Sequence, residues 1–412
     1  MNRIAVCGLG KLGSPIAAVF AASEVPVIGF DVDVRKVAKI NSGQAPVDEP
    51  ELQAYLDLNE VRTNLKATND IEEAVKQSDA CMFVTPTPSL PTGAFDHTLL
   101  SIAIDNVVHE VARQRKRKYV FVINSTVMPR FLNDQVLPLL RRFLGSLGFG
   151  LAYKPEFIAL GTVIRDLHYP DVLLIGQDTE ETGMSVERLY RQMVLHDCQA
   201  RRMKLVEAEL AKISLNCAVT MKISFANQVG AVAACLGADP LKVLGAVGFD
   251  RRIGHAALRP GLPFGGPCFP RDNRMLQHVA LSVGVRAPLS EATDTVNRKL
   301  LREILERIPL HGEVGILGLA YKPGTPITDE AAGSWWLQAL RSRGRTVKAH
   351  DPQAAHPNEL EEVLACQTII VACGWPEYKR ITVRPGTVVI DPAGETVVEY
   401  SEATVATELK EA

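Results

Sequence analysis

The sequence predicts an α/β protein in which two α/β domains with parallel sheets flank a central helical domain with a long connecting helix. Short apolar strand segments alternate with helical segments in the first half of the chain, and the same alternation returns near the C-terminus. Between them, strand signals thin out and apolar residues recur at helical spacing. Because 412 residues are too many for one ordinary core, we expect domains at 1–202, 203–297 and 298–412.

Each sheet is predicted from four short apolar segments. In the first domain the expected strands are Ile4–Val6, Val25–Phe30, Ala80–Val84 and Val120–Ile123. In the last domain they are Val314–Leu317, Val347–His350, Thr368–Ala372 and Val388–Ile390. Helix-compatible windows separate the strands, which is typical of parallel sheets. The two ends of the chain therefore look like distant structural echoes of one another.

The central domain is predicted from apolar residues at helical spacing. They are Leu210, Ile213, Cys217, Met221 and Phe225. We expect this first helix to be long and to link the flanking domains, and such a surface is a common place for subunit pairing.

Composition excludes several classes of partner. The formal net charge of −2 argues against binding to nucleic acid or to an anionic membrane. The basic run Arg113–Lys118 is typical of the solvated end of a helix. No secretion signal and no apolar run of about 20 residues is found. The eight cysteines lack CxxC or metal-finger spacing, so we expect reduced thiols, no metal and a cytoplasmic location.

A dinucleotide site is predicted where the first strand ends. The turn GLGKLG supplies the expected cofactor residues Gly8, Gly10, Leu12 and Gly13. Its glycines let the backbone approach a pyrophosphate, while the amides of the following helix face its charge. Asp31 ends the second strand, where a carboxylate accepts hydrogen bonds from both ribose hydroxyls and favours NAD over NADP. Together these features predict a Rossmann-like domain. Arg35 either steadies the adenosine phosphates or faces solvent.

A candidate nucleophile lies in the turn FGGPCFPRD, residues 264–272. Cys268 stands there among glycines and prolines, where backbone can approach a ligand, and nearby positive charge would favour its thiolate. The alternative for a single intracellular cysteine is a buried, inert thiol.

A pair of polar side chains is expected on one helical face. Lys212 and Asn216 are four residues apart, so both can reach one oxygen. An ammonium and an amide suit a developing oxyanion. The alternative is a surface lysine and a capping asparagine.

Beyond these features, the chain resembles the UDP-glucose/GDP-mannose dehydrogenase family over nearly its whole length. The matching motifs are Gly8–Gly13 with Asp31, Ile40–Gly43 with Pro46 and Glu49–Pro50, Thr85–Pro88, Ser125–Val127, Pro155–Phe157, Lys212 with Asn216, Arg252–Gly254, Gly265–Asp272, Gly318–Lys322, Asp351–Pro352 and Trp375–Tyr378. So many motifs in order are poorly explained by chance.

The resemblance implies a nucleotide-sugar 6-dehydrogenase that uses two NAD to oxidise a C6 alcohol to a carboxylate. Cys268 would form a thiohemiacetal and then a thioester, and Glu156 or a neighbour would activate the hydrolytic water. Lys212 and Asn216 would stabilise oxyanions. Asp272 would support a water or the lysine, and Thr126 would hold a water or touch the cofactor.

The resemblance also implies the remaining contacts and partners. The further cofactor residues are Thr85, Pro86 and Thr126, and the substrate-binding residues are Glu156, Phe157, Lys212, Asn216, Arg252, Phe264, Gly265 and Lys322. We expect a UDP-sugar substrate and a homodimer, in which the Arg252 loop reaches sugar or phosphate.

Four positions depart from the family pattern. Lys154 stands where the family has asparagine, and Leu160 where it has a second acid. Asp329 replaces an arginine that would touch cofactor phosphate or substrate, and Arg271 replaces a lysine. The nucleophile, lysine and amide remain, so we expect an active but divergent enzyme.

Alternatives stay open at this point. UDP-glucose is the favoured substrate, but Arg259-Pro260-Gly261 also suits the GDP-mannose branch. UDP-N-acetylhexosamine dehydrogenases carry a different cysteine segment. A two-electron β-hydroxyacid dehydrogenase shares the cofactor domain and the lysine/asparagine helix but lacks the cysteine motif and the third domain. Leu160 and Asp329 also leave room for a non-catalytic sugar-nucleotide-binding protein.

Overall fold

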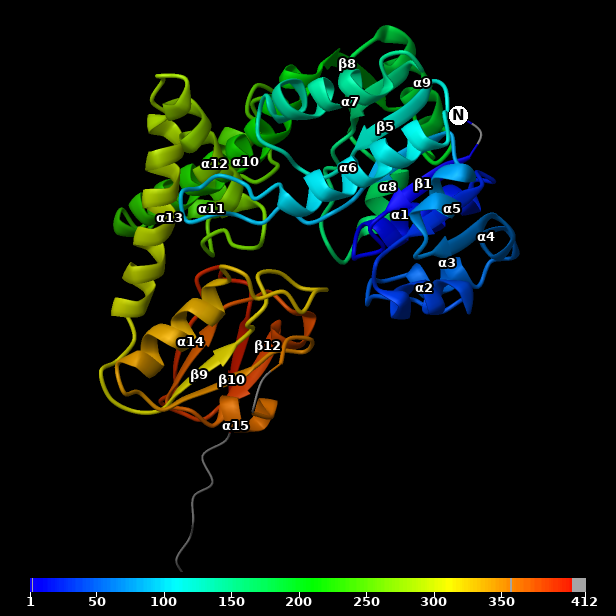
Figure 1. The fold of residues 1–412 in the computed structure, drawn as a ribbon. Helices are drawn as coiled ribbons and strands as arrows, with labels where there is room; N and C mark the ends of the chain where they lie inside the picture. Colours follow the sequence, from blue (N-terminus) through cyan, green and yellow to red (C-terminus); the bar gives the residue numbers. More distant parts are fainter. Residues whose placement is uncertain (2, 356–357, 402–412) are drawn as a thin grey trace, which may run out of the picture. The chain divides into compact units, whose positions relative to one another are not determined.

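The structure is a computed structural model that describes residues 1, 3–355 and 358–401 (Figure 1). The chain divides into two compact units, Met1–Ser214 and Leu215–Ala412. Each unit is described separately, with the labels of Figure 1.

The first unit is built on an eight-stranded sheet with the order β3-β2-β1-β4-β5-β6-β7-β8. Its strands are β1 (Ile4–Cys7), β2 (Val27–Phe30), β3 (Leu65–Thr68), β4 (Ala80–Phe83), β5 (Tyr119–Ile123), β6 (Phe149–Tyr153), β7 (Val172–Gln177) and β8 (Gln199–Lys204). The four predicted strands are confirmed as β1, β2, β4 and β5. Strands β1 to β6 are mutually parallel, whereas β7 pairs antiparallel with β6 and parallel with β8, so the last two strands run in the opposite direction.

Helices cover both faces of this sheet. They are α1 (Gly13–Ala22), α2 (Val34–Asn41), α3 (Leu52–Leu56), α4 (Asn59–Asn64), α5 (Ile71–Lys76), α6 (Thr98–Arg113), the π-helix η1 (Leu132–Val136), α7 (Leu137–Leu144), α8 (Val163–His168) and α9 (Glu180–Arg191). Successive strand residues point to opposite faces, so Val120 and Val122 join one buried cluster while Phe121 and Ile123 join the other. The unit therefore has three layers.

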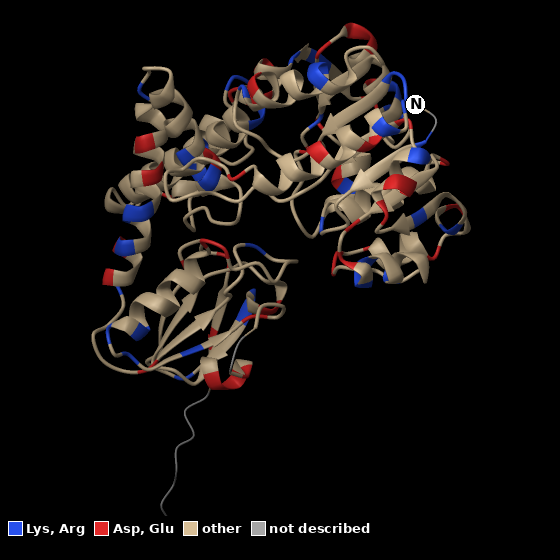
Figure 2. Ribbon diagram, in the orientation of Figure 1, with Lys and Arg blue, Asp and Glu red and all other residues tan. Residues whose placement is uncertain are grey.

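The basic run at 113–118 lies at the end of α6, as predicted. Arg113 pairs with Glu72 and Glu110 at 2.8 and 2.7 Å, and the Lys116 ammonium donates to the backbone carbonyl of Val75. Over the residues that the structure describes, acidic and basic side chains are interspersed (Figure 2).

The predicted long helix is confirmed as α10 (Leu205–Cys235), and the division between the units falls within it. The apolar residues that predicted this helix are not all buried. Ile213 and Cys217 are buried, but Leu210, Met221 and Phe225 are each more than 40% exposed. Part of this helix thus presents apolar side chains outward.

The second unit contains the rest of α10, further helices and two sheets. Its helices are α11 (Pro240–Gly248), α12 (Phe269–Ser282), α13 (Pro288–Glu306), α14 (Ala332–Ser342), α15 (Leu360–Leu364) and the 3₁₀-helix η2 (Pro376–Tyr378). A parallel sheet has the order β10-β9-β11-β13, and β12 pairs in parallel with β14. The strands are β9 (Val314–Leu317), β10 (Val347–His350), β11 (Thr368–Val371), β12 (Arg380–Val383), β13 (Val388–Ile390) and β14 (Val397–Tyr400). All four strands predicted for this domain are present.

The predicted echo between the two α/β ends is visible at the turn after the first strand of each. Gly8 and Gly318 have φ angles of +102° and +97°, which side chains disfavour. A Cβ atom on Gly13 would lie 1.8 Å from the Gly8 carbonyl oxygen, and one on Gly333 would lie 2.0 Å from that of Gly318. Both helices therefore pack on their turns through glycine.

The serine after each of these helix glycines completes the match. The Ser14 hydroxyl donates to the Leu9 carbonyl at 3.0 Å, and the Ser334 hydroxyl donates to the Leu319 carbonyl at 2.9 Å. The two turns use the same backbone design.

None of the helices in the described residues is both long and apolar enough to cross a membrane.

Candidate active site

The Gly8–Gly13 turn has the geometry that a dinucleotide requires. Gly8 approaches the Val84 carbonyl so closely that a Cβ atom would lie 2.5 Å from its oxygen. A Cβ on Gly10 would meet no atom within 4 Å, so the backbone there is open to a ligand. With Gly13 packing α1 on the turn, each glycine meets one of the three needs of a pyrophosphate-binding turn. The residues present therefore fit a dinucleotide.

Asp31 lies at the end of β2, beside this turn. Its carboxylate accepts hydrogen bonds from the Leu9 amide at 2.7 Å and from the Lys36 ammonium at 3.1 Å. Arg35 is paired with Asp33 at 2.9 Å, and its side chain is 86% exposed. Of the two alternatives for Arg35, contact with the adenosine phosphates or a position facing solvent, the structure shows the side chain facing solvent.

The other predicted polar residues of the first unit follow the carboxyl ends of neighbouring parallel strands. Thr85 and Pro86 come after β4, Thr126 after β5 and Glu156 after β6. Carboxyl ends of parallel strands meet at one edge of a sheet, which is where open α/β sheets bind ligands. The Thr85 amide donates to the Ser125 hydroxyl at 2.9 Å, which joins two of these strand ends.

Glu156 is held by two buried side chains. The Lys154 ammonium lies 2.6 Å from its Oε2, and the Asn124 amide donates to its Oε1 at 3.2 Å. Lys154 is 2% exposed and lies 4.3 Å from the centre of the Tyr190 ring. The lysine that departs from the family pattern therefore neutralises the candidate water-activating carboxylate directly.

Leu160 has a packing role in the structure. Its side chain contacts the buried cluster that contains residues of α1 and α8. An apolar contact thus occupies the position of the family's second acid.

Lys212 reaches the Glu156 segment from α10. Its ammonium donates to the Glu156 carbonyl at 2.7 Å and lies 4.5 Å from the centre of the Phe157 ring. The side chain is buried, so the surface-lysine alternative is wrong. The structure thus brings Lys212, Glu156 and Phe157 together.

Cys268 is exposed and stands at the N-cap position of α12 in the second unit. The Asp272 amide donates to its carbonyl at 2.8 Å, which starts the helix. The buried Asp272 carboxylate accepts from the Asn216 amide at 2.6 Å and from the Arg271 guanidinium at 2.9 Å. Asn216 is therefore an oriented buried amide and not a helix cap. Its amide nitrogen carries two hydrogens, so a second donor remains after the bond to Asp272.

Cys217 shows the contrast with an inert thiol. It lies near Asp272 but is buried, and burial with the neighbouring carboxylate raises the pKa of this thiol to about 12. Of the eight cysteines, only Cys268 and Cys235 are exposed. Exposure and the helix N-terminus distinguish Cys268 as the candidate nucleophile.

The turn before Cys268 is tightly packed. A Cβ atom on Gly265 would lie 2.5 Å from the Glu330 carbonyl oxygen, and one on Gly266 would lie 2.6 Å from the Tyr321 ring. The Gly266 amide donates to the Asp329 carbonyl at 2.8 Å. Asp329 therefore contributes its backbone to the cysteine turn, although it lacks the arginine side chain of the family.

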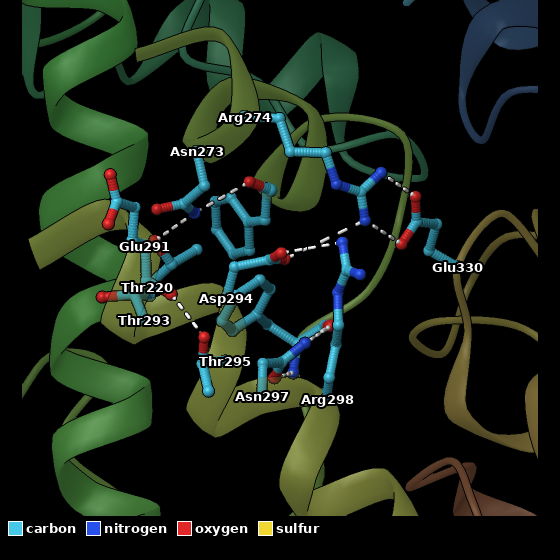
Figure 3. A network of polar contacts seen from close by, with 12 residues as sticks. Thr220, Asn273, Arg274, Glu291, Thr293, Asp294, Thr295, Asn297, Arg298 and Glu330 are labelled. Carbon is cyan, nitrogen blue, oxygen red and sulfur yellow. Dashed lines mark hydrogen bonds and ion pairs between the residues drawn. The ribbon is translucent and has the colours of Figure 1, made fainter. Parts of the chain in front are cut away.

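A polar network surrounds this turn (Figure 3). The Arg274 guanidinium donates to both Glu330 oxygens at 2.5 and 2.8 Å and also faces Asp294, which pairs with Arg298 at 2.8 Å. The Asn297 amide accepts from the Phe264 amide at 2.8 Å and donates to its carbonyl at 2.9 Å. Phe264 and Gly265, both predicted substrate residues, are thus fixed in place by this network and by the packing beside it.

Two predicted substrate residues are found in other surroundings. Arg252 is exposed and forms a bidentate pair with Asp250, with its NH2 2.7 Å from the Asp250 carboxylate. The Lys322 ammonium lies 6.0 Å from the centre of the Tyr321 ring. Their roles towards substrate stay predictions. Among the described residues, no group of three His, Cys, Asp or Glu side chains could hold a metal ion.

The sequence alone did not point to several side chains that hold the site. Asn124 and Tyr190 contact Lys154 or Glu156, and His97 and Glu209 contact the backbone after Thr126. His97 and Tyr190 lie outside the motifs, whereas Asn124 directly precedes the Ser125–Val127 motif, and in each case only folding brings about the contact. Glu209, three residues before Lys212, carried the one available signal, because a carboxylate on a buried helical face needs a partner.

Three family models match the chain. They describe the NAD-binding domain (residues 2–194), the central domain (206–299) and the UDP-binding domain (315–398) of the UDP-glucose/GDP-mannose dehydrogenase family. A GDP-mannose 6-dehydrogenase of Pseudomonas putida is 33% identical over 85% of this chain and 80% of its own length. The UDP-glucose 6-dehydrogenase AglM of Haloferax volcanii is 31% identical over 92% of this chain and 93% of its own length.

A solved structure gives the same assignment. The UDP-glucose dehydrogenase of Pyrobaculum islandicum matches with a TM-score of 0.86 and 30% identity, and the match covers 97% of both chains. The fold and the dinucleotide turn define an NAD-dependent oxidoreductase that acts on CH–OH groups. The chain belongs to the UDP-glucose/GDP-mannose dehydrogenase family.

Proposed function

We propose that this protein oxidises the C6 alcohol of a nucleotide sugar to a carboxylate in one site, through a covalent adduct on Cys268. The observation that carries the proposal is the exposed Cys268 thiol at the N-terminus of α12, one turn from the buried Asp272–Asn216 pair. NAD supplies the hydride acceptor for both oxidations.

The proposed reaction balances as two oxidations and one hydrolysis. The alcohol loses a hydride and a proton to give an aldehyde, and the Cys268 sulfur adds to its carbonyl carbon to give a thiohemiacetal. Loss of a second hydride and proton gives a thioester, which water cleaves to the acid and the free thiol. The sum consumes one alcohol, two NAD and one water, and releases the acid, two NADH and two protons.

The side chains suit these steps. Lys212 and Asn216 are donors for the oxygen that becomes negative during hydride loss and thiol addition. Asp272 orients the Asn216 amide, whose second N–H is the proposed donor to the reacting oxygen. Glu156, which Lys154 and Asn124 hold in place, is the group proposed to activate the hydrolytic water. That the sulfur, ammonium and amide meet at one nicotinamide face is part of this proposal.

The remaining assignments belong to the same proposal. The cofactor residues are Gly8, Gly10, Leu12, Gly13, Asp31, Arg35, Thr85, Pro86 and Thr126, and the further substrate residues are Phe157, Arg252, Phe264, Gly265 and Lys322. The functional domains are 1–202, 203–297 and 298–412.

UDP-glucose is the proposed substrate, and GDP-mannose is the alternative. Relatives named for each have nearly the same identity to this chain, so similarity alone favours neither. The family model over residues 315–398 describes a UDP-binding domain, which supports the uridine nucleotide.

We also propose a cytoplasmic homodimer. All eight cysteines are free, in keeping with a reducing compartment. Large apolar side chains on α10, on α11 and in the turn between them are exposed in the single chain, namely Met221, Phe225, Val232, Leu236, Leu241, Val243 and Val247. An apolar surface of this kind is typical of a subunit interface.

A substrate panel with a thiol variant tests the proposal. Purified protein is incubated with NAD and UDP-glucose, GDP-mannose or a TDP-sugar, and NADH is read by absorbance. We expect turnover with UDP-glucose, and no acid from Cys268→Ser, although that variant still binds nucleotide. Cys235→Ser is the matched control, because Cys235 is the other exposed thiol. Undiminished acid formation by Cys268→Ser would exclude the thioester route.

A further inference from the structure

The loop that carries Thr126 is held by side chains from three other segments of the first unit. The Thr87 hydroxyl donates to the Thr126 carbonyl at 2.7 Å. The Met128 amide donates to Nε2 of His97 at 3.2 Å. Further along, Glu209 of α10 accepts from two backbone amides. The loop from β5 to η1 is therefore anchored along its whole length.

The Glu209 contact is the closest of these. Its Oε2 accepts from the Arg130 amide at 2.6 Å and its Oε1 from the Leu132 amide at 3.0 Å. The Glu209 side chain is fully buried. A buried carboxylate needs such donors, and both of its oxygens are satisfied by one short stretch of backbone.

The backbone at this point is unusual in two respects. Arg130 has φ +79°, a backbone conformation that residues other than Gly, Asn and Asp rarely adopt. The following residues, Leu132–Val136, form a π-helix, a rare conformation that is frequently found at functional sites. Such a conformation persists only when its surroundings fix it. Glu209 supplies two of those fixing bonds.

Glu209 also connects this loop to the lysine helix. It lies three residues before Lys212, whose ammonium is bonded to the Glu156 carbonyl. One helix thus carries the donor for the reacting oxygen and the anchor for the Thr126 loop.

We propose that Glu209 and His97 are positioning residues of the dehydrogenase, which hold the Thr126 loop in register with Lys212. The inference rests on the proposed function, because it assumes that Thr126 and Lys212 act on the substrate or the cofactor. Neither Glu209 nor His97 is among the residues proposed to touch the reacting atoms.

The charge states agree with these roles. Burial lowers the pKa of His97 to about 4, so the ring is neutral near pH 7 and Nε2 can accept from the Met128 amide. Burial raises the pKa of Glu209 to about 7, an effect that Asp134 strengthens and the two amide donors oppose. The charged groups that act on the pKa values of these two residues are Asp134, which pairs with Arg130, for Glu209 and Asp96 for His97. Glu209 therefore becomes the full double acceptor as pH rises through about 7.

The first test compares Glu209→Gln with the full-length wild type. Glutamine keeps the shape but can accept only one of the two amides, as the protonated carboxyl does. We expect kcat to fall by roughly tenfold or more at pH 8, as for other small misplacements of catalytic groups, with a smaller change in KM for the sugar nucleotide. The ratio of wild-type to variant kcat should rise with pH through about 7 and then level off. Glu207→Gln is the control, because Glu207 is an exposed acid on the same helix.

A second pair of variants serves if Glu209→Gln does not fold. His97→Phe keeps the ring that stacks on Phe131 at 4.0 Å but removes the acceptor, whereas His97→Gln keeps an acceptor. We expect His97→Phe to lower kcat and His97→Gln to restore part of it.

The outcomes separate the two proposals. An active wild type whose kcat is unchanged by Glu209→Gln, or lowered by the same factor at every pH, would overturn the positioning role. If His97→Phe and His97→Gln are equally active, the His97 part is overturned. A wild type without NADH production on any sugar nucleotide would contradict the proposed function itself.

Discussion

Lys154 shows how a single replacement can be absorbed by the fold. Sequence comparison marks it only as a departure from an expected asparagine. In the structure its buried ammonium lies 2.6 Å from the Glu156 carboxylate and faces the Tyr190 ring. A lone buried carboxylate is costly, and the lysine offsets that cost where the family's asparagine carries no charge.

We expect Lys154→Met to destabilise the protein by about 3–5 kcal/mol, because it leaves Glu156 buried without its charge partner. The free energy of unfolding in urea measures this loss. The double variant Lys154→Met/Glu156→Gln should recover much of it, since no buried charge is then left unpaired. A loss below about 1 kcal/mol in the single variant would mean that the pair contributes no more than a surface ion pair.

Asp31 and Asp351 show how similar turns differ in function. Both carboxylates accept from the amide that follows the turn glycine. Asp351 is fully buried and also accepts from the Ala320, Gln353 and Ala354 amides and the Trp375 indole. Donors from the protein itself occupy the Asp351 oxygens. The last domain therefore has the same turn as the first, but its carboxylate is not available to ribose hydroxyls.

At the scale of elements, apolar runs predicted several of the strands that are buried on both faces, but not the largely buried strands β6 and β7. Strands β1, β4 and β5 are continuous apolar runs, β11 is apolar after Thr368, and each was predicted. The edge strand β8 has the sequence QARRMK and is largely exposed, so no apolar pattern marks it. Its place, and the reversal at β7, depend on pairing with distant strands that local sequence does not encode.

The site follows the same division. Glycine spacing predicted the turn geometry, because each glycine meets a local backbone need. The anchors Glu209, His97 and Asn124 act through contacts between segments, and only Glu209, an acid on a buried helical face, gave a sequence signal. Sequence therefore predicted the groups proposed to react, but not those that hold them.

The element that presents Cys268 yields a prediction of its own. The pair between Arg274 of α12 and Glu330 braces the turn that the Gly266–Asp329 bond also holds. We expect Glu330→Gln to change stability by about 1 kcal/mol or less, because both side chains are partly exposed. The rate of acid formation should fall by roughly threefold to tenfold, because the thiol loop, the turn at residues 264–268 that carries Cys268, is then held less firmly.

The control for this prediction is Glu303→Gln, which breaks an exposed pair with Lys299 on α13. It should leave the rate of acid formation unchanged. Equal rates for the two variants would show that the Arg274–Glu330 pair does not support the thiol loop.

At the scale of the whole molecule, the chain has an α/β region at each end, and both regions contain the same kind of glycine turn. The helical segment between them carries the Asn216 amide and the Cys268 thiol. Unit 1 contains the dinucleotide turn and brings Lys212 and Glu156 together. Unit 2 brings together Cys268, Asp272 and Asn216. The proposed four-electron chemistry needs both sets, whereas a two-electron dehydrogenase of the β-hydroxyacid type needs no thiol.

The most direct test of this account is the number of NADH molecules formed for each nucleotide sugar consumed. NADH is measured by absorbance at the end of a reaction with limiting sugar nucleotide and excess NAD, and the product is identified by mass. The account predicts two NADH and a carboxylate. One NADH, with an aldehyde or ketone as the product, would contradict it.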